Sequence, residues 1–400
     1  MRVLVVHNRY SSRVPSGENL AVDDEVRWLR DAGVEVVTLE STNDDVVASG
    51  LAVQLRTGIR SLWSTGASDD IGSLLDEVRP DIVHVHNLFP LFTASVPATA
   101  RRRGLPVVWT VHNFRVRCVA GTRFRDGRPC DDCRPGWRIP GVVHRCYGDS
   151  VPASALVGTA TSIFRGWARR GNVTAVGISH EMGRWLVDEA GFPPHDVRVK
   201  HNGVAVPPTS RADDPAGCSA IAYVGRLTRE KGVDLLLDAW HRVEAPVRLR
   251  FVGGGDLERA IERAAADDPR IELVGSVPSA EVGSYIAGAR AVVVPSVWTE
   301  PFGRVAAEAL AHGRAVVTTG HGALGEIVDP SCGWITGSDV DRLARALGVA
   351  ATDDDAVRAR GAAARERHRA MFAPEPTTQV LLDIYRDALR AAGRRTLGPG

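Results

Sequence analysis

Lysine, cysteine and long apolar runs are scarce in this chain of 400 residues. No apolar run approaches the ~18 residues that a membrane-spanning helix needs, so we expect no integral membrane segment. The first residues lead directly into an apolar strand, without the basic, apolar and cleavage regions of a secretory signal, which predicts a cytoplasmic protein. The net charge of +1 lacks the basic excess of nucleic-acid-binding domains, so no nucleic-acid partner is expected.

The basic residues are almost all arginine, because only Lys200 and Lys231 are lysines. Residues 101–170 contain fourteen arginines against four aspartates, a local excess of ten positive charges. The same part of the chain carries the aromatic side chains of Trp137, Phe164 and Trp167. This segment is either a solvated face or a surface that meets an anionic acceptor or an anionic membrane.

Strand-length apolar runs alternate with amphipathic helical stretches, which is typical of βαβ units and parallel sheets. In the first half we predict strands at 3–6, 34–39, 82–85, 107–111 and 175–178. The helices of that half are predicted at 19–31, 68–78, 93–103, 153–169 and 181–189. In the second half we predict strands at 220–224, 248–252, 271–274, 291–294 and 315–318, and a last helix at 377–392.

A proline-rich and polar stretch interrupts this alternation and marks a domain boundary. We therefore predict two doubly wound α/β domains, since 400 residues exceed what one core usually supports. Their expected ranges are 1–206 with a cysteine-containing insertion at about 113–150, a linker at 207–216, a second domain at 217–374, and a helix and tail at 375–400. Ligands of such sheets bind beyond the carboxyl ends of the strands, so residues that directly follow strands are the candidates for a site.

Two glutamates follow the strand predicted at 291–294. Pro301 suits the first position of a helix and Gly313 the residue just past its end. Glu300 is then expected at the helix mouth, and Glu308 roughly 10 Å further along the axis, a distance that fits the two ends of a sugar nucleotide. Each carboxylate can accept hydrogen bonds from neighbouring hydroxyls, and the helix amides between them can bind a diphosphate. The alternative is that both are ordinary helix glutamates.

A basic loop and a glycine loop follow the first two strands of the second half. Arg226 and Lys231 present a guanidinium and an ammonium that can neutralise a departing diphosphate, and a lysine in so arginine-rich a chain indicates that a compact charge matters there. Gly254 lies among three glycines that permit a phosphate or base to approach the backbone. The alternatives are an exposed basic turn and an ordinary strand-to-helix connection.

In this order the motifs resemble the signature of the retaining family 4 glycosyltransferases of GT-B fold. The matching residues are Gly225-Arg226-Leu227 with Glu230-Lys231-Gly232, then Gly253-Gly254-Gly255-Asp256, then Glu300-Pro301-Phe302-Gly303 with Glu308. Residues of the first half also lie where this family carries site residues: Gly17-Glu18, His86-Asn87 and Thr110-Val111-His112-Asn113. The resemblance implies two Rossmann-like domains facing each other across a cleft, with a C-terminal helix that crosses back to the first domain.

The resemblance also implies roles for the residues of the second domain. Arg226 and Lys231 would bind the donor diphosphate, Glu308 the ribose, and Glu300 the transferred sugar. Amides at two further positions would assist, namely Phe302 and Gly303.

Two residues of the first domain complete the implied site. Gly17 would approach the phosphates, and His112 would point toward the sugar, although a histidine at a strand end is often structural. With Arg226, Lys231 and Glu300, His112 makes up the expected catalytic set. The chain departs from the family pattern at Ser16, where many relatives have another glycine, and at Arg304, where a smaller or apolar residue is common.

The implied reaction is transfer of a sugar from a nucleoside diphosphate sugar to a hydroxyl acceptor with retention of configuration. No cofactor and no catalytic metal are expected, because the D-x-D sequence Asp339-Val340-Asp341 is better explained as a helix start. The acceptor would be a glycan, a lipid-linked molecule or another hydroxyl compound in cell-envelope, exopolysaccharide or glycolipid biosynthesis, at the inner face of the plasma membrane. Alternatives are glycosylation of a small natural product, an epimerase, a phosphorylase, and a non-catalytic protein that binds nucleotide sugars.

The predicted insertion contains four cysteines: Cys118, Cys130, Cys133 and Cys146. The spacing of the middle pair is that of a zinc knuckle, so a structural zinc is one hypothesis and four free thiols are the other. Two histidines of the strand predicted at 82–85 and its end, His84 and His86, share a face, and we assign them to packing and the site rather than to a metal.

Overall fold

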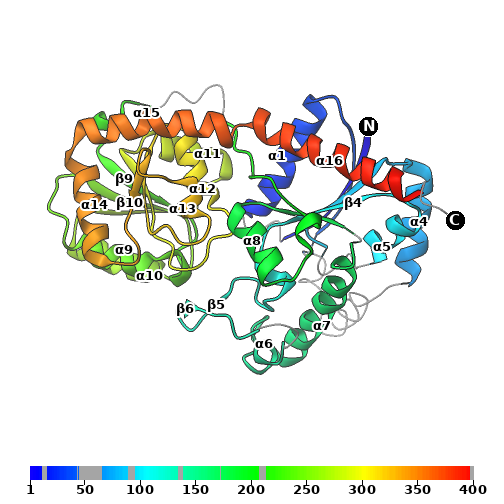
Figure 1. The fold of residues 1–400 in the computed structure, drawn as a ribbon. Helices are drawn as coiled ribbons and strands as arrows, with labels where there is room; N and C mark the ends of the chain where they lie inside the picture. Colours follow the sequence, from blue (N-terminus) through cyan, green and yellow to red (C-terminus); the bar gives the residue numbers. More distant parts are fainter. Residues whose placement is uncertain are drawn as a thin grey trace. The chain divides into compact units, whose positions relative to one another are not determined.

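A computed structural model describes residues 1–10, 16–42, 44, 65–88, 95–133, 138–171, 173–206 and 213–396 (Figure 1). The chain divides into two compact units. Unit one comprises Met1–Arg123, Asp131–Gly203 and Thr377–Gly400, and unit two comprises Phe124–Cys130 and Val204–Pro376. Each unit is built around its own six-stranded sheet. Most of the linker predicted at 207–216 lies outside the described residues.

The sheet of unit one has the strand order β2-β1-β3-β4-β7-β8, and neighbouring strands are parallel. The strands are β1 (Arg2–Arg9), β2 (Glu35–Thr42), β3 (Ile82–Val85), β4 (Val107–Val111), β7 (Thr174–Gly177) and β8 (Val197–Val199). The five strands expected from the sequence are confirmed. The edge strand β8 was not predicted, because a run of three residues with a central arginine does not stand out from a loop.

Two apolar clusters cover the two faces of this sheet, because successive side chains of a strand point to opposite faces. On β1, Leu4 and Val6 belong to one cluster, whereas Val3 and Val5 belong to the other. The longer helices described in unit one are α1 (Gly17–Asp31), α4 (Thr65–Val78), α5 (Ser95–Arg102), α7 (Val151–Ala168), α8 (His180–Asp188) and the last helix, α16 (Pro374–Thr396). Two residues of the helix predicted at 93–103, 93 and 94, lie outside the described residues.

The last helix packs in unit one, as the predicted return of the C-terminal helix requires. Leu381, Ile384 and Tyr385 of α16 are buried in the same cluster as Val3 and Val5 of β1. From Thr377 onward the chain therefore belongs to unit one, although the preceding helix, α15 (Asp354–Met371), belongs to unit two.

The predicted insertion contains little regular secondary structure among its described residues. Its described elements are a 3-10 turn η1 (Phe114–Val116), a hairpin of β5 (Phe124–Arg125) and β6 (Arg128–Pro129), and α6 (Ile139–Val143). Two of its arginines form hydrogen bonds with backbone carbonyls inside unit one. Arg117 donates to the Glu189 carbonyl at 2.7 Å, and Arg138 donates to the Arg117 carbonyl at 2.8 Å. Two of the arginines that make up the local basic excess are thus buried.

The sheet of unit two has the order β11-β10-β9-β12-β13-β14 with parallel neighbours, which is the 3-2-1-4-5-6 order of a Rossmann fold. Its strands are β9 (Ala220–Val224), β10 (Arg248–Val252), β11 (Ile271–Gly275), β12 (Ala291–Val294), β13 (Ala315–Thr318) and β14 (Gly333–Ile335). The five predicted strands are confirmed, and the three-residue β14 was not predicted. Its Gly-Trp-Ile sequence gives no period on which to recognise a strand.

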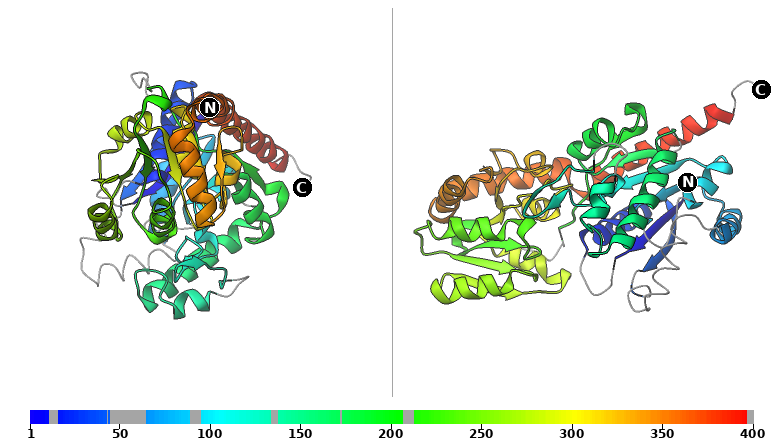
Figure 2. Two further views of the ribbon diagram at one scale, coloured as in Figure 1. Left: turned by 90° about the vertical axis from the view of Figure 1, so that its left-hand side faces the viewer. Right: turned by 90° about the horizontal axis from the view of Figure 1, so that it is seen from below.

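Helices cover both faces of this second sheet (Figure 2). They are α9 (Val233–Trp240), α10 (Glu258–Asp267), α11 (Ser279–Ala287), α12 (Arg304–Ala311), α13 (Leu324–Ile327), α14 (Val340–Thr352) and α15. Asp339 caps α14, since its carboxylate accepts from the Arg342 amide at 2.8 Å, which confirms the helix-start explanation of the D-x-D sequence. None of the helices in the described residues is both long and apolar enough to cross a membrane.

Candidate functional site

The order of strands in unit two reverses between β9 and β12. In open parallel sheets a ligand binds beyond the carboxyl ends of the strands at such a reversal. The loop after β9 carries Arg226 and Lys231, and the loop after β12 carries Glu300. The topology therefore gathers three of the predicted site residues at one edge of one sheet.

Close backbone packing ties these two loops together. The Val297 amide donates to the Glu230 carbonyl at 3.0 Å. Gly232 has a φ of 75°, and a Cβ at this position would lie 1.9 Å from the Pro295 carbonyl oxygen. Only glycine satisfies both conditions, so Gly232 permits the contact that brings Lys231 beside the loop after β12.

Lys231, which is partly exposed, forms an ion pair with the buried Glu300 at this edge. The Lys231 Nζ lies 2.5 Å from Glu300 Oε1, and Ser296 Oγ donates to the same oxygen at 2.8 Å. Burial works to raise the pKa of Glu300, but the Lys231 charge and hydrogen bond outweigh it, so the pKa lies below its ordinary value. Glu300 is therefore an ionised hydrogen-bond acceptor at neutral pH, rather than a proton donor. The Lys231 ammonium also lies 5.0 Å from the Trp298 ring centroid.

The helix after Glu300 begins later than the sequence predicted. Pro301 lies in the loop, and α12 starts at Arg304 after Gly303, which has a φ of 93°. A Cβ on Gly303 would lie 2.6 Å from Leu324 Cδ2, so packing against α13 helps to fix this left-handed turn. The expectation of a continuous helix from Pro301 was wrong, and with it the estimated distance between the glutamates along the helix axis.

Glu308 and Phe302 have defined surroundings in unit two. Glu308 is the fifth residue of α12, and its Oε1 accepts from Arg304 Nε at 2.8 Å. Arg304, the unusual residue of the motif, thus forms an ion pair one helical turn away. Phe302 is buried, with its ring centroid 6.0 Å from that of Phe372. Gly313 follows the end of α12, as predicted.

Arg226 extends from the loop after β9 and keeps 55% of its side chain exposed. Its Nη2 lies 3.1 Å from Glu230 Oε1, and its carbonyl accepts from the Tyr223 hydroxyl at 2.5 Å. The next residue, Leu227, donates its amide to the Gly254 carbonyl at 2.9 Å. Gly254 therefore lies against the basic loop, so the loops after β9, β10 and β12 form one connected edge.

In unit one the strand order reverses between β1 and β3. Gly17 is the first residue of α1, and Ser16 caps this helix because its Oγ accepts from the Asn19 amide at 3.4 Å. The serine that departs from the family pattern thus has a local structural role. His86 follows β3 and His112 follows β4, so both lie at the carboxyl edge of the sheet.

The two histidines at this edge touch each other and lead to a buried polar cluster. His86 Nδ1 lies 2.9 Å from His112 Nε2. His84 Nε2 lies 2.8 Å from Thr110 Oγ1, and His84 Nδ1 lies 2.6 Å from the Tyr385 hydroxyl. The pairing of His84 with these two hydroxyls agrees with a packing role.

Glu25 and Lys200 form a second ion pair, which is buried on both sides and was not predicted from the sequence. A signal was present, since Glu25 stands among the buried apolar residues of α1 where an amphipathic helix normally has an apolar side chain. Lys200 is the other lysine of the chain. Both lysines thus pair with a buried glutamate, one in each unit.

Burial controls the charges in the cluster of unit one. It lowers the pKa of His84 and of His112 well below the ordinary value, and it lowers the pKa of His7 to about 4. For Glu25, burial works to raise the pKa, but Lys200 and the hydrogen bond with His86 outweigh it and hold the pKa well below its ordinary value. At neutral pH these three histidines are therefore neutral and Glu25 is a carboxylate.

The four cysteines of the predicted zinc site are free thiols in the structure. Burial and the nearby Cys118 raise the pKa of Cys133, so these two thiols are neighbours. Among the described residues, no group of three or more potential ligands within metal-binding distance includes a cysteine. The thiol positions give the zinc hypothesis no support beyond the Cys118 and Cys133 pair, and it stays a prediction.

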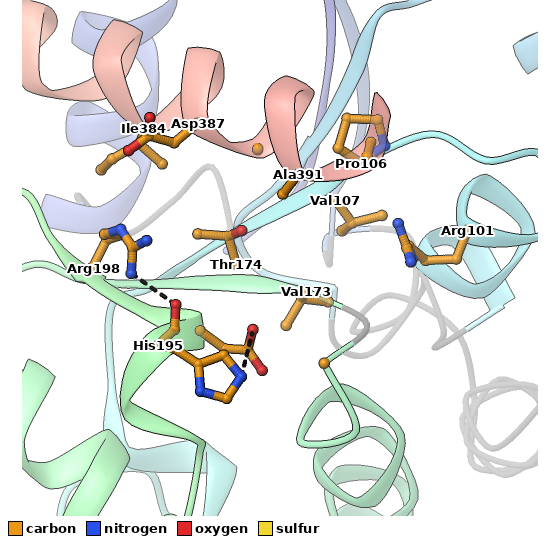
Figure 3. A pocket seen from close by; sticks show the side chains of 14 residues that line it. Arg101, Pro106, Val107, Val173, Thr174, His195, Arg198, Ile384, Asp387 and Ala391 are labelled. Carbon is orange, nitrogen blue, oxygen red and sulfur yellow. Dashed lines mark hydrogen bonds and ion pairs between the residues drawn. The ribbon is translucent and has the colours of Figure 1, made fainter. Parts of the chain in front are cut away.

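A pocket in unit one lies away from the predicted site (Figure 3). Val107 and Thr174 line it at the beginnings of β4 and β7, and Ile384 of α16 contributes from above. Arg198 borders it and donates to the His195 carbonyl at 2.8 Å. The pocket is thus at the amino edge of the sheet, where ligands of parallel sheets are not expected. It contains none of the predicted site residues.

Two family models match the chain. Residues 16–206 match the model described as Glycosyltransferase Family 4, and residues 219–353 match the model described as Glycosyl transferases group 1. An alpha-maltose-1-phosphate synthase of Mycolicibacterium smegmatis is 32% identical over 412 residues, which cover 96% of this chain and 99% of that protein.

Solved structures of similar proteins match the fold over nearly the whole length of the chain. Anabaena HepE in complex with UDP-glucose matches with a TM-score of 0.66 at 16% identity, over 97% of this chain and 100% of that chain. A sucrose-phosphate synthase from Thermosynechococcus elongatus matches with a TM-score of 0.68 at 18% identity, over 98% of this chain and 99% of that chain. At these identities the likeness shows the fold alone.

Proposed function

The chain belongs to glycosyltransferase family 4, with the GT-B fold, and on that premise we propose how it holds its donor and which stereochemistry it follows. It is an enzyme that transfers a glycosyl group from a nucleotide sugar. We place the donor diphosphate at the edge of β9 and β12 in unit two. The observation that carries this proposal is the ion pair of Lys231 with the buried Glu300, which fixes a cation and an ionised carboxylate at the reversal of strand order.

In this proposal Arg226 and Lys231 bind the diphosphate. The guanidinium of Arg226 is exposed and can therefore reach a ligand. The ammonium of Lys231 is held in place by the Glu300 carboxylate and the Trp298 ring. Glu300 accepts hydrogen bonds from hydroxyls of the transferred sugar, since its pKa keeps it ionised. Glu308 accepts from the ribose hydroxyls.

Backbone groups and unit one complete the proposed site. The left-handed turn at Gly303 supports a role for the amides of Phe302 and Gly303 in binding the donor. Gly254 lets the donor approach the loop after β10. From unit one the proposal assigns Gly17 to the phosphates and His112 to the sugar, as the family resemblance implies.

The proposed step breaks the bond between the anomeric carbon and the diphosphate oxygen, and its electron pair leaves with the diphosphate. The acceptor oxygen attacks the same face of the sugar, and its proton passes to the departing phosphate, so configuration is retained. Arg226 and Lys231 stabilise the charge that develops on the leaving group, which is the kind of electrostatic contribution that often dominates catalysis. No protein nucleophile enters this scheme.

A screen of nucleotide sugars tests the proposed function. Thermal shifts with a panel of donors identify the one that binds, and product formation with that donor and a panel of hydroxyl acceptors then separates a transferase from a protein that only binds. We expect turnover, and a product whose anomeric proton coupling in NMR matches that of the donor. An inverted product would contradict the retaining scheme, and binding without any hydrolysis or transfer would contradict catalysis.

We propose a lipid-linked acceptor at an anionic membrane, in cell-envelope, exopolysaccharide or glycolipid biosynthesis, in preference to a small natural product. The supporting surface is formed by α6 and α7, which pack against each other (Figure 1). Four of its apolar side chains are exposed, namely Ile139, Val143, Val151 and Ile163. The sequence of α7 contains no acidic residue, and exposed arginines follow this surface at Arg145, Arg169 and Arg170. Exposed apolar groups beside cations suit the interface of an anionic bilayer.

Sedimentation with liposomes tests this surface. We expect the protein to sediment with vesicles that contain anionic lipid, and the double variant Val143→Glu/Ile163→Glu to lose most of this binding. Val380→Glu is a control, since Val380 is also an exposed valine of unit one but lies on α16. Equal sedimentation of all three proteins, or none by the parent, would remove the membrane from the proposal.

A further inference from the structure

We propose that Glu25 is a positioning residue that acts through His86 and holds the proton of neutral His112 on Nε2. His112 Nδ1 then carries a lone pair and accepts a hydrogen bond from a hydroxyl of the sugar substrate. The second part rests on the proposed function, which assigns His112 to the sugar. The first part is a property of unit one alone.

The three side chains form a continuous line inside unit one. Glu25 lies in the middle of α1, His86 follows β3, and His112 follows β4. Glu25 Oε1 is 3.4 Å from His86 Nε2, and His86 Nδ1 is 2.9 Å from His112 Nε2. Among the described residues, Glu25 Oε1 and His86 Nε2 are both buried and have no better hydrogen-bond partner than each other.

The charge of Glu25 determines which ring nitrogens of His86 and His112 carry a proton. Lys200 pairs with the other oxygen of Glu25, which favours the carboxylate. A carboxylate can only accept, so the facing His86 Nε2 must carry a hydrogen. In the neutral form of His86, which this proposal requires, Nδ1 then has a lone pair. His112 must donate to that lone pair from Nε2. Its own lone pair is left on Nδ1, at the ring nitrogen that faces away from His86.

The neighbouring groups agree with this assignment. The pKa of His112 lies well below its ordinary value, chiefly because the ring is buried and secondly because His86 is near, so His112 is neutral at pH 7. His84 Nδ1 lies 3.5 Å from the same Glu25 oxygen, but it competes little, because the ring nitrogens of His84 lie 2.6 Å from the Tyr385 hydroxyl and 2.8 Å from Thr110 Oγ1. His7, whose ring centroid is 6.1 Å from that of His86, is held by Asn19 Oδ1 at 3.0 Å.

A metal ion is the competing explanation, since Glu25, His84 and His86 have potential ligand atoms within 4.8 Å of one another. The geometry favours a proton network instead. The ammonium of Lys200 is in contact with Glu25, and a cation bound there would face this positive charge. His84 would also have to give up a hydroxyl partner to ligate a metal.

The test is the ¹⁵N NMR signature of His112, because the two neutral tautomers give distinct nitrogen shifts. The signals are measured on the full chain without substrate, and are assigned by comparison with His112→Asn. We expect the Nε2–H tautomer in the parent. In Glu25→Gln, where the amide can donate to His86 Nε2, we expect His86 to reverse and His112 to change to the Nδ1–H tautomer.

Two further variants keep the test decisive. Glu25→Gln leaves Lys200 buried without its carboxylate, so Glu25→Gln/Lys200→Met removes both charges and is expected to show the same change of tautomer. Glu181→Gln is the control, since Glu181 is a carboxylate of unit one on α8 that pairs with Arg184. An Nδ1–H tautomer of His112 in the parent, or an unchanged tautomer in a folded Glu25→Gln or double variant, would overturn the proposal. A metal-induced shift of the His84 and His86 signals on addition of Zn²⁺ would overturn it in favour of a metal site.

Kinetics separate this inference from the proposed function. If His112 serves the sugar, Glu25→Gln should lower kcat by about 10- to 100-fold, the effect of one misdirected hydrogen bond, and leave the affinity for the donor diphosphate in unit two within about twofold. An unchanged kcat together with the changed tautomer would overturn the role of His112 Nδ1 at the sugar. Absence of any transfer by the parent would contradict the proposed function and leave the tautomer result standing.

Discussion

Each of the two lysines of the chain forms an ion pair with a buried glutamate, one in each unit. Lys200 neutralises Glu25 among buried histidines, and Lys231 neutralises Glu300 at the carboxyl edge of β9 and β12. Neither pair is predictable from the sequence, because the partners of the first are 175 residues apart and those of the second 69 residues apart. The sequence does predict that Lys231 and Glu300 belong to a site, since each follows a strand in a recognisable motif.

The Lys231–Glu300 ion pair should make the free energy of unfolding depend on pH. The pKa of Glu300 in the folded chain lies below its ordinary value of 4.5, so the pair stabilises unit two above that pH and loses its effect as the pH falls through the lowered value. Glu300→Gln should therefore cost about 3 kcal/mol at pH 7, near the lower end for a buried pair because Lys231 is partly exposed, and less at pH 3.

Thermal denaturation of the parent and of Glu300→Gln between pH 3 and pH 7 measures this difference. Glu281→Gln is the control, since Glu281 is an exposed carboxylate on α11 of the same unit. A destabilisation by Glu300→Gln that stays constant over the whole range would contradict the assignment of the lowered pKa to this ion pair.

At the scale of elements, the alternation of apolar runs and helical stretches predicts ten strands of the two sheets. It fails for β8 and β14, which have three residues each and lie at sheet edges. It also places the start of α12 three residues early, since the left-handed turn at Gly303 depends on packing against Leu324, a contact that no local pattern encodes. Loop geometry at the site is therefore the part that the sequence predicts least well.

The loop after β9 should depend on Gly232. Gly232→Ala would place a methyl group 1.9 Å from the Pro295 carbonyl oxygen in addition to straining the φ of 75°, so the loop must move and Lys231 must leave Glu300. We expect a loss of stability of about 1–3 kcal/mol and an affinity for the donor at least tenfold lower. Calorimetric titration with the donor and thermal denaturation measure the two effects.

Gly33→Ala is the control that separates backbone strain at a positive φ from the steric clash of the added methyl group. Gly33 has a φ of +80°, but a Cβ there has nothing within 4 Å. The control should lose stability through strain alone and keep the affinity of the parent for the donor. Equal donor affinities of Gly232→Ala and the parent would show that the loop contact does not position Lys231.

At the scale of the whole molecule, the order of strands fixes where each unit can bind a ligand. The reversal in unit two falls at the loops that carry the donor motifs, and the reversal in unit one falls at the loops that lead to Gly17 and His86. The doubly wound class follows from the sequence, because alternating elements leave few other arrangements. The family resemblance adds the return of the last helix, which the buried face of α16 confirms.

Unit one should depend on this last helix. A chain that ends at Ala373 loses the buried side chains of Leu381, Ile384 and Tyr385, each worth about 1.5–3 kcal/mol of burial. Their sum is comparable to the whole stability of a domain, so unit one should lose its cooperative unfolding transition in calorimetry. A chain that ends at Gly393 keeps these residues and serves as the control. An unchanged transition in the shorter chain would contradict the assignment of α16 to unit one.

The central claim is that unit two holds the donor diphosphate at the edge of β9 and β12, and the affinity of Arg226→Ala for the donor tests it most directly. Arg229→Ala is the matched control, because Arg229 lies in the same loop and keeps 73% of its side chain exposed. We predict that Arg226→Ala binds the donor about 10- to 100-fold more weakly in calorimetric titration, the effect of losing a charged hydrogen bond, while Arg229→Ala binds like the parent. Full donor affinity in Arg226→Ala would contradict the claim.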